Sequence, residues 1–250
     1  MEISEKEREW LDRRMGFISA SELHNLFSAS GKFIDGMVDY CRHKRFERKH
    51  GYVIPFTSRA IEIGKEQERY AYEWLKANVE ELKDTLVYAQ DLPEIPFWTL
   101  PDLRFGASPD TFTEDRKLIV EIKTVVGITD TEYYDDESIP YEQKRDRVSS
   151  EHWAQLAGQL LSSPETEEIW LVKYLPQLDD VDKDTDSPTA PWRGWLFKFR
   201  RDEFDLKGLQ ERITLFDRII DTGDNLEDVK SDWNKALKEE AEKKKWESPR

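Results

Sequence analysis

The residue pattern with the clearest chemical potential is an aspartate followed by a Glu-x-Lys sequence in an apolar stretch. Asp110 lies eleven residues before Glu121, and Glu121 and Lys123 belong to the segment Leu118–Lys123. Side chains alternate between the two faces of a strand, so Glu121 and Lys123 point the same way. The polar stretch 113–117 predicts a turn, and the resulting hairpin would bring Asp110 beside Glu121. Two carboxylates and one ammonium suit a hard divalent cation and a water activated on it.

A third carboxylate lies on the apolar face of a predicted helix over Ser58–Lys76. The apolar stripe of this helix consists of Ile61, Gly64, Ala71 and Leu75, and Glu68 falls in its middle. A carboxylate on a buried helix face is costly unless it is paired or bound to a cation. Glu68 is therefore a third metal-site carboxylate, a residue at the rim, or a partner in a salt bridge to Arg104 or Lys123.

Two glutamines stand out in the helical pattern of residues 151–161. Gln155 and Gln159 are four residues apart, so they share a face next to the apolar one. The simplest interpretation of both is a glutamine at the border between core and solvent, and for Gln159 we favour it.

A helix start is predicted near the N-terminus, where Ser19 and Glu22 form an S-x-x-E capping box. Such a start exposes backbone N–H groups, and Ser21 adds a hydroxyl beside them. Arg14 could supply a bidentate fork for a phosphate. The alternative is a plain capped helix with surface arginines.

Taken in order, four segments resemble the lambda-exonuclease-like viral recombination nucleases of the PD-(D/E)XK superfamily. These segments cover about a third of the chain, and they are Trp10–Leu26, Ala60–Leu75, Arg104–Val125 and Tyr141–Leu161. The resemblance implies a phage-type, Mg²⁺-dependent (or Mn²⁺-dependent) exodeoxyribonuclease that degrades one strand of linear double-stranded DNA from its 5′ end. It would leave 3′ single-stranded tails for recombination by strand annealing. A homotrimer ring around the DNA and a single-strand annealing protein as partner are further implications.

The resemblance also assigns roles to individual residues of this chain. It implies that the metal is held by Glu68, Asp110, Glu121 and Ile122, and that Asp110, Glu121 and Lys123 are catalytic, with Lys123 positioning the attacking water. It implies that the terminal 5′-phosphate is bound by Arg14, Ser21, Ser108 and Gln155. Two alternatives remain open, namely a structure-specific or restriction-type endonuclease of the same fold and a DNA-binding relative that has lost catalysis.

Composition narrows the class of protein. Hydrophobic residues make up 38% of the 250 residues and include nine Trp, which supports a packed core. The single cysteine, Cys41, excludes an internal disulfide and a four-cysteine metal site. No apolar run reaches the roughly 18 residues of a membrane span, and the N-terminus lacks signal-peptide features. We expect a cytoplasmic protein of a bacterial or phage-infected cell, with no membrane contact.

The net charge of −15 argues at first against a DNA-binding protein, because a phosphate backbone attracts a basic surface. The charge is unevenly distributed, however. Residues 42–50 are strongly basic, and Lys144, Arg145 and Arg147 precede the Gln155 helix, whereas acid gathers at 130–137, at 179–186 and after Asp221. This pattern predicts a basic inner face and an acidic exterior. The alternative is a solvated basic helix without a ligand.

The order of predicted elements indicates an α/β fold. Helices are expected at Glu5–Arg13, Ser19–Ser28, Phe33–Lys49, Ser58–Lys76, Val148–Leu161, Phe204–Thr222 and Leu226–Trp246. Strands are expected at Val87–Asp91, Leu103–Ser108, Leu118–Thr124, Glu168–Tyr174 and Gly194–Arg200, with a surface loop over Pro176–Pro191. Helices flanking such a strand set predict a three-layer α/β/α PD-(D/E)XK core with a mixed central sheet. We expect a single nuclease domain over residues 1–250, ending in a charged helix from about residue 226.

Overall fold

A five-stranded mixed sheet forms the centre of the protein. The computed structural model describes residues 4–28, 31–53, 59–125, 128–176 and 187–247. In spatial order the strands are β2 (Leu86–Tyr88), β5 (Thr111–Thr113), β6 (Leu118–Thr124), β7 (Glu168–Tyr174) and β8 (Gly194–Arg200). Strands β6 and β7 are parallel, and the other neighbours are antiparallel. The predicted bounds of β6, β7 and β8 are confirmed.

A smaller sheet ties the N-terminal segment to the strand that precedes Asp110. Its order is β1 (Ile18–Ser19), β4 (Phe105–Ala107) and β3 (Trp98–Thr99). The parallel pairing of β1 with β4 sets Ser19 opposite Gly106. This pairing places the residues after α1 (Glu5–Arg14) close to the chain that enters the central hairpin.

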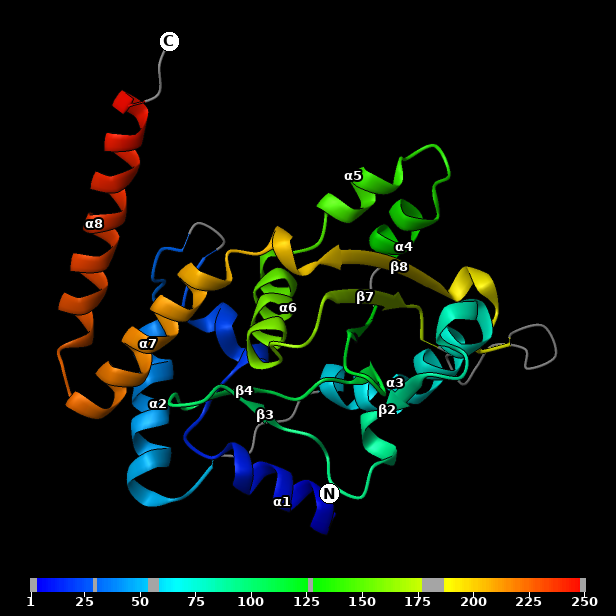
Figure 1. Ribbon diagram of the computed structural model, residues 1–250, viewed down its shortest axis with the longest axis horizontal. Coiled ribbons are helices and arrows are strands. Elements are labelled where there is room, and N and C mark those ends of the chain that lie inside the picture. The colour runs from blue at the N-terminus through cyan, green and yellow to red at the C-terminus, as the bar shows by residue number, and fades with distance from the viewer. Residues whose placement is uncertain (1–3, 29–30, 54–58, 126–127, 177–186, 248–250) are drawn as a thin grey trace.

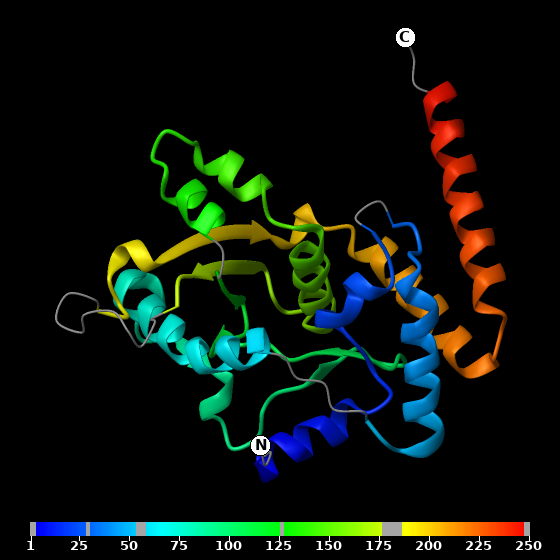
Figure 2. The same cartoon turned by 180° about the vertical axis from the view of Figure 1, so that it is seen from behind.

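Helices cover both faces of the five-stranded sheet, as predicted for a three-layer fold (Figures 1 and 2). On one face, α3 (Arg59–Asn78) packs Ala71 and Leu75 against Val120 and Val172. The other face carries α6 (Ser150–Ser162), with α7 (Leu206–Thr222) packed beside it and α2 (Gly36–His50) packed against α7. The buried side chains of this second layer include Leu156, Leu160, Ile213, Phe216 and Met37, together with Ile119 and Leu171 from the sheet. Side chains on the two faces of β6 and β7 thus pack into two separate hydrophobic cores.

The last helix, α8 (Leu226–Glu247), runs away from the body of the protein, as both views show. Its first half is fastened to the segment before α2. Trp233 donates its indole N–H to the carbonyl of Gly31, and the amide of Asn234 makes two hydrogen bonds with the backbone of Phe33.

The predicted α-helix over Ser19–Ser28 is wrong. Ser19 belongs to β1, and only a 3₁₀ helix, η1 (Ala20–Asn25), follows it. The Ser19 hydroxyl donates to the carboxylate of Glu22 at 2.5 Å and makes no capping bond to the backbone. Glu22 also accepts from the Tyr40 hydroxyl at 2.9 Å, so α2 draws this carboxylate away from the capping position.

Two helices went unpredicted, α4 (Ile128–Asp135), which overlaps the acidic stretch 130–137, and α5 (Tyr141–Asp146), which carries two of the basic residues before the Gln155 helix. They lie over the β8 edge of the sheet (Figure 1). The backbone N–H of Lys198 donates to the Tyr141 hydroxyl at 2.8 Å, and Arg145 donates to the Lys198 carbonyl at 3.2 Å. Side chains of α5 thereby satisfy both outward backbone groups of Lys198 on the edge strand.

The remaining short elements are four 3₁₀ helices, η2 (Glu80–Leu82), η3 (Ala89–Asp91), η4 (Pro191–Arg193) and η5 (Arg201–Glu203). Most of the surface loop predicted over Pro176–Pro191 lies outside the described residues. Within the described ranges, the search for a helix with the length and apolar character of a membrane span finds none.

Candidate active site

All nine residues to which the sequence assigned a site role line one cleft of about 720 Å³. They are Arg14, Ser21, Glu68, Ser108, Asp110, Glu121, Ile122, Lys123 and Gln155. They come from α1, η1, α3, the turn before β5, strand β6 and helix α6. Segments up to about 140 residues apart therefore meet at the same opening (Ser21 and Gln155 are examples).

The hairpin of β5 and β6 positions Asp110 as predicted. Thr111 pairs with Val120, and the turn at 113–117 closes with a hydrogen bond from the Arg116 N–H to the Thr113 carbonyl at 2.8 Å. The Asp110 carboxylate accepts the backbone N–H of Ile122 at 2.8 Å. This bond fixes Asp110 beside the β6 residues that carry Glu121 and Lys123.

Glu121 is the most enclosed carboxylate of the site, with 1% of its surface exposed. One oxygen lies 2.6 Å from Nε2 of Gln155 and 2.7 Å from Nζ of Lys123. The other oxygen accepts from Nε2 of Gln159 at 2.5 Å. Gln159 is itself 1% exposed, so its interpretation as a border glutamine is wrong. A spacing of four on a helix aims both amides at one carboxylate.

Burial and mutual repulsion disturb the ionisation of the site. Burial raises the pKa of Asp110 well above its usual range, and the nearby charges of Glu121 and Glu68 add to the effect. Burial likewise raises the pKa of Glu68 to about 7. For Lys123, burial opposes the charged form, but the attraction of Glu121 and Asp110 outweighs it and raises the pKa. Three carboxylates thus lie close to the ammonium of Lys123 in this part of the cleft.

Glu68 is not neutralised by either of the basic partners considered from the sequence. Arg104 pairs with Asp221, and Lys123 with Glu121. Oε1 of Glu68 is buried and has no hydrogen-bond partner among the described residues. Of its stripe, Ala71 and Leu75 enter the core and Ile61 is 38% exposed at the cleft, so Glu68 sits where the helix passes from core to cleft.

The donor chemistry of this cleft fits a hard divalent cation. Buried carboxylates with raised pKa values and an unpartnered carboxylate oxygen gain stability when a cation offsets their charge. As the described side chains stand, three or more acidic, His or Cys groups do not converge into a ready-made set of ligands. Glu121 is oriented by two amides and an ammonium, and it can bind a cation together with Asp110, while Glu68 offers a carboxylate oxygen without a hydrogen-bond partner among the described residues.

Arg14, also in the lining of the cleft, presents a guanidinium without a polar partner among the described residues. It stacks on the ring of Trp10 at 4.2 Å, and it makes no hydrogen bond or ion pair with a described residue. The indole N–H of Trp10 donates to the Ser108 hydroxyl at 2.7 Å. Trp10 thus connects two residues assigned to phosphate binding, a role that its type and position alone did not signal.

A second group that sequence reasoning missed lies beside Lys123. Lys173 is its register partner on β7, and Nζ of Lys173 lies 3.0 Å from Nδ1 of His152 on α6. Burial lowers the pKa of Lys173 to about 8 and that of His152 to about 3, and in both cases the neighbouring lysines add to the effect. The parallel register of β6 and β7 was the signal that could have found Lys173.

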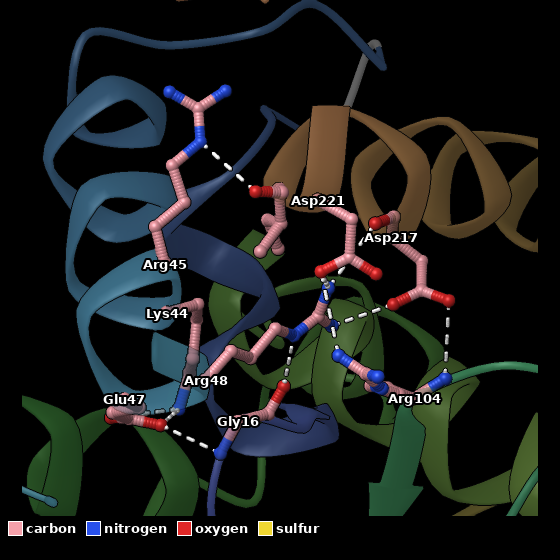
Figure 3. Close-up of polar contacts among 9 residues, drawn as sticks. Gly16, Lys44, Arg45, Glu47, Arg48, Arg104, Asp217 and Asp221 are labelled. Atoms are coloured by element: carbon pink, nitrogen blue, oxygen red, sulfur yellow. Dashed lines mark hydrogen bonds and ion pairs between the residues drawn. The ribbon is translucent and has the colours of Figure 1, made fainter. Parts of the chain in front are cut away.

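The basic run of residues 42–50 does not form the predicted DNA-facing surface along its length. Lys44 is 6% exposed and pairs with Glu22 and Glu47. Arg45 and Arg48 turn inward to α7, as Figure 3 shows. The second group is also engaged within the chain: Lys144 donates to the Tyr134 carbonyl, Arg145 pairs with Glu203, and Arg147 pairs with Asp130. The interpretation as an open basic face is wrong for these residues, because internal acceptors use their charge.

The fold is a mixed α/β core, with the hairpin carrying Asp110 and Glu121 at its centre. The structure is similar to that of an alkaline exonuclease from Laribacter hongkongensis, with a TM-score of 0.60 and 18% identity over 94% of this chain and 98% of that one. The same exonuclease in complex with dAMP matches with a TM-score of 0.58, 18% identity and the same coverage of both chains. A phage-related exonuclease from Haemophilus somnus 129PT matches with a TM-score of 0.57 and 16% identity, over 82% and 93% of the two chains.

These likenesses confirm the fold that the sequence resemblance implied. No protein-family profile matches the chain, and a search of curated proteins returned no match.

Proposed function

We propose that this protein is a Mg²⁺-dependent exodeoxyribonuclease that degrades linear double-stranded DNA in the 5′-to-3′ direction. The observation that carries the proposal is the joint placement of a carboxylate–lysine centre and an uncommitted arginine in one cleft. The fold likeness to two exonucleases supports it, and the dAMP complex of the Laribacter enzyme supports a deoxynucleotide as the product.

The cation would be held by Asp110 and Glu121, with Glu68 and the backbone of Ile122 completing its surroundings. Bound Mg²⁺ supplies a Lewis acid that polarises the scissile phosphate and lowers the pKa of a coordinated water. Mn²⁺ has the same preference for oxygen ligands and would substitute.

The chain's own residues orient the reaction. Lys123 is held as a cation by Glu121, so its ammonium can place the attacking water and offset the charge that develops on the phosphate. The amides of Gln155 and Gln159 hold the Glu121 carboxylate in one orientation. Asp110 is fixed by the Ile122 N–H, so the two carboxylates keep their relative position through the cycle.

Recognition of the end would fall to Arg14 and three further residues of the cleft. The Arg14 guanidinium donates to none of the described residues, and two of its N–H groups match two phosphate oxygens. The hydroxyls of Ser21 and Ser108 and the second amide N–H of Gln155 would supply further donors. A terminal 5′-phosphate held there would place the next phosphodiester at the carboxylates, which gives the enzyme its direction.

The role in the cell follows from this activity. Removal of one strand from the 5′ end leaves 3′ single-stranded tails, the substrate for recombination by strand annealing, and an annealing protein would be the partner. We infer a cytoplasmic enzyme that works as a ring of three subunits around the duplex. Light scattering of the purified protein tests the ring, and a mass of one subunit would reject it.

The decisive experiment measures release of acid-soluble nucleotides from linear duplexes with 5′-phosphate or 5′-hydroxyl ends and from closed circular DNA, with Mg²⁺ or EDTA. We expect release from linear DNA only, dependent on Mg²⁺ and fastest on 5′-phosphate ends. Lys123→Ala should lower the rate of nucleotide release about 10²-fold or more. The control Lys117→Ala changes an exposed lysine just before the same strand and should be neutral. Cleavage of circular DNA would instead identify an endonuclease.

A further inference from the structure

A glycine turn connects the arginine of the cleft to the small sheet, and α2 holds this turn on both sides. Gly16 follows α1 and has a φ of 73°, which favours glycine. Its carbonyl accepts from Nε of Arg48 at 2.8 Å, and its N–H donates to the carboxylate of Glu47 at 2.9 Å. Two successive residues of α2 therefore fix the peptide groups of one residue, two positions after Arg14 (Figure 3).

The Arg48 side chain that bonds Gly16 is also held by two residues of α7. Its other nitrogens donate to the Asp217 carboxylate at 2.6 Å, to the Asp217 carbonyl at 3.2 Å and to the Asp221 carboxylate at 2.9 Å. These partners belong to α7, and the Arg48 side chain is only 8% exposed. An added Cβ on Gly16 would lie 2.8 Å from Cγ of Arg48, so the turn and this side chain fit closely together.

Glu47 is also connected, through Lys44 and Glu22, to the serines of the cleft. Its carboxylate pairs with Lys44 at 3.1 Å, and Lys44 in turn lies 3.4 Å from Glu22. Glu22 accepts from the Ser19 hydroxyl at 2.5 Å, and Oγ of Ser19 lies 3.3 Å from that of Ser21. One row of polar contacts therefore leads from α7 through α2 to a cleft residue.

The row balances the charge of Arg14 without occupying its donors. It contains the carboxylates of Glu22, Glu47 and Asp217 against the cations Lys44 and Arg48, which leaves an excess of negative charge. Burial lowers the pKa of Arg14, while Glu22 and Glu47 oppose this and favour the charged form. Arg14 is attracted toward the row, yet it forms no ion pair with a described residue. Its N–H groups stay open to a ligand.

Stability alone is a weak reason for such a row, since buried ion pairs often gain little over apolar packing. We propose that Glu47 and Arg48 are positioning residues for the terminal phosphate, acting through Gly16 on Arg14. The proposal rests on the proposed 5′-phosphate recognition. Neither residue lines the cleft, so neither contacts the phosphate, and the contact that both make with Arg14's segment is their hold on the Gly16 turn.

The test is the ratio of initial rates on 5′-phosphate and 5′-hydroxyl duplexes that are otherwise identical. Arg48→Lys keeps the charge but removes the guanidinium that donates to Gly16 and Asp217 at the same time. Glu47→Gln weakens the hydrogen bond that the Gly16 N–H donates to residue 47. We expect each to lower the ratio about tenfold, mainly through KM on phosphorylated ends, with the rate on hydroxyl ends within about twofold of wild type. Glu47→Asp should restore part of the ratio if its shorter carboxylate still reaches the Gly16 N–H.

Arg45→Lys is the matched control. Arg45 lies one turn earlier on α2 and donates to the carbonyls of Ile219 and Ile220 at the end of α7, without touching Gly16. It should leave the ratio unchanged. In an Arg14→Ala background, Arg48→Lys should have no further effect on the ratio, because the two act on one contact.

The outcomes separate two failures. If wild type prefers phosphorylated ends and folded Arg48→Lys and Glu47→Gln keep that preference, or slow both ends equally, the positioning role is overturned. If wild type itself shows no preference, the proposed phosphate recognition fails, and the positioning role fails with it. Thermal unfolding of each variant shows that it is folded, and Glu47→Gln decides the matter where Arg48→Lys does not fold.

Discussion

The indole N–H of Trp10 donates to the Ser108 hydroxyl at 2.7 Å while the ring of Trp10 supports the guanidinium of Arg14. One side chain of α1 thus connects a residue of the same helix with a residue just before the β5–β6 hairpin. Ser108 is two residues from Asp110, so this bond couples the position of the proposed phosphate site to that of the carboxylates.

Trp10→Phe should separate the two contacts of this side chain, because it keeps an aromatic face under Arg14 and removes the N–H. We expect a loss of about 1 kcal/mol in binding of 5′-phosphorylated ends, roughly fivefold in KM, with a smaller effect on hydroxyl ends. Steady-state kinetics on both substrates measures it. Trp233→Phe removes an indole hydrogen bond to Gly31 far from the cleft and should not change KM. An unchanged KM in Trp10→Phe would contradict the role of the bond.

Gln159→Leu should weaken the hold on Glu121, because one carboxylate oxygen loses its amide donor. Groups that orient a metal-binding carboxylate typically contribute about 10–100-fold in metal affinity. We therefore expect the Mg²⁺ concentration for half-maximal activity to rise about tenfold or more, as a metal titration of the nuclease rate would show. Gln210→Leu, on the exposed side of α7, is the control. The same Mg²⁺ requirement in Gln159→Leu and wild type would rule this role out.

Glu68→Gln should stabilise the metal-free protein at pH 8. The folded-state pKa of Glu68 is raised to about 7 from 4.5, so its contribution to stability is present at low pH and is lost as pH rises through 7. Glutamine avoids this loss, about 1–3 kcal/mol in the free energy of unfolding. Melting in EDTA at pH 8 should show a higher Tm than wild type, and Mg²⁺ should raise the variant's Tm less.

The matched control for Glu68 is Glu66→Gln, an exposed position two residues away on α3. It should show neither effect. Equal Mg²⁺-induced shifts in wild type and Glu68→Gln would mean that Glu68 does not contact the cation.

His152→Gln should reduce the loss of stability in mild acid. The pKa of His152 falls to about 3 when it is buried beside Lys173, Lys123 and His24, against 6.5 for an ordinary histidine. Between these values the unfolded chain binds the proton and the folded one does not, so stability falls as pH is lowered through 6.5. Urea unfolding at pH 7.5 and pH 5 should show a decrease about 2 kcal/mol smaller in the variant. A decrease of the same size in both proteins would show that His152 is protonated normally.

The sequence was most informative where local pattern and long-range packing agree. The apolar runs of β6 and β7 are buried on both faces, so their composition defines their bounds. The turn between β5 and β6 is predictable from the polar residues 113–117 alone. The strand register that follows from it places Asp110 next to β6. Nine residues of the cleft were predictable because the four segments of the sequence resemblance contain them, whereas Lys6, Glu7, Tyr88 and Gln90 of its lining lie outside those segments.

The rest depended on partners that are distant in sequence. Ser19 and Glu22 have the spacing of a helix cap, but Tyr40 and Lys44 on another helix compete for the same carboxylate. The basic run on α2 has the composition of a DNA-binding surface, yet acceptors on α7 and in the Gly16 turn use much of it. Gln159 differs from a border glutamine only through the burial of Glu121. Such choices are made by tertiary contacts, which spacing alone does not encode.

The contact between α5 and Lys198 has a consequence for the behaviour of many copies together. Strand β8 is an edge of the sheet, and a seven-residue edge with open backbone groups can template the addition of a strand from another chain. Tyr141 and Arg145 occupy both outward groups of Lys198 in the middle of this edge. A foreign strand could pair along β8 only after displacing α5. Helix α5 thereby guards the sheet against growth into filaments when the protein is crowded.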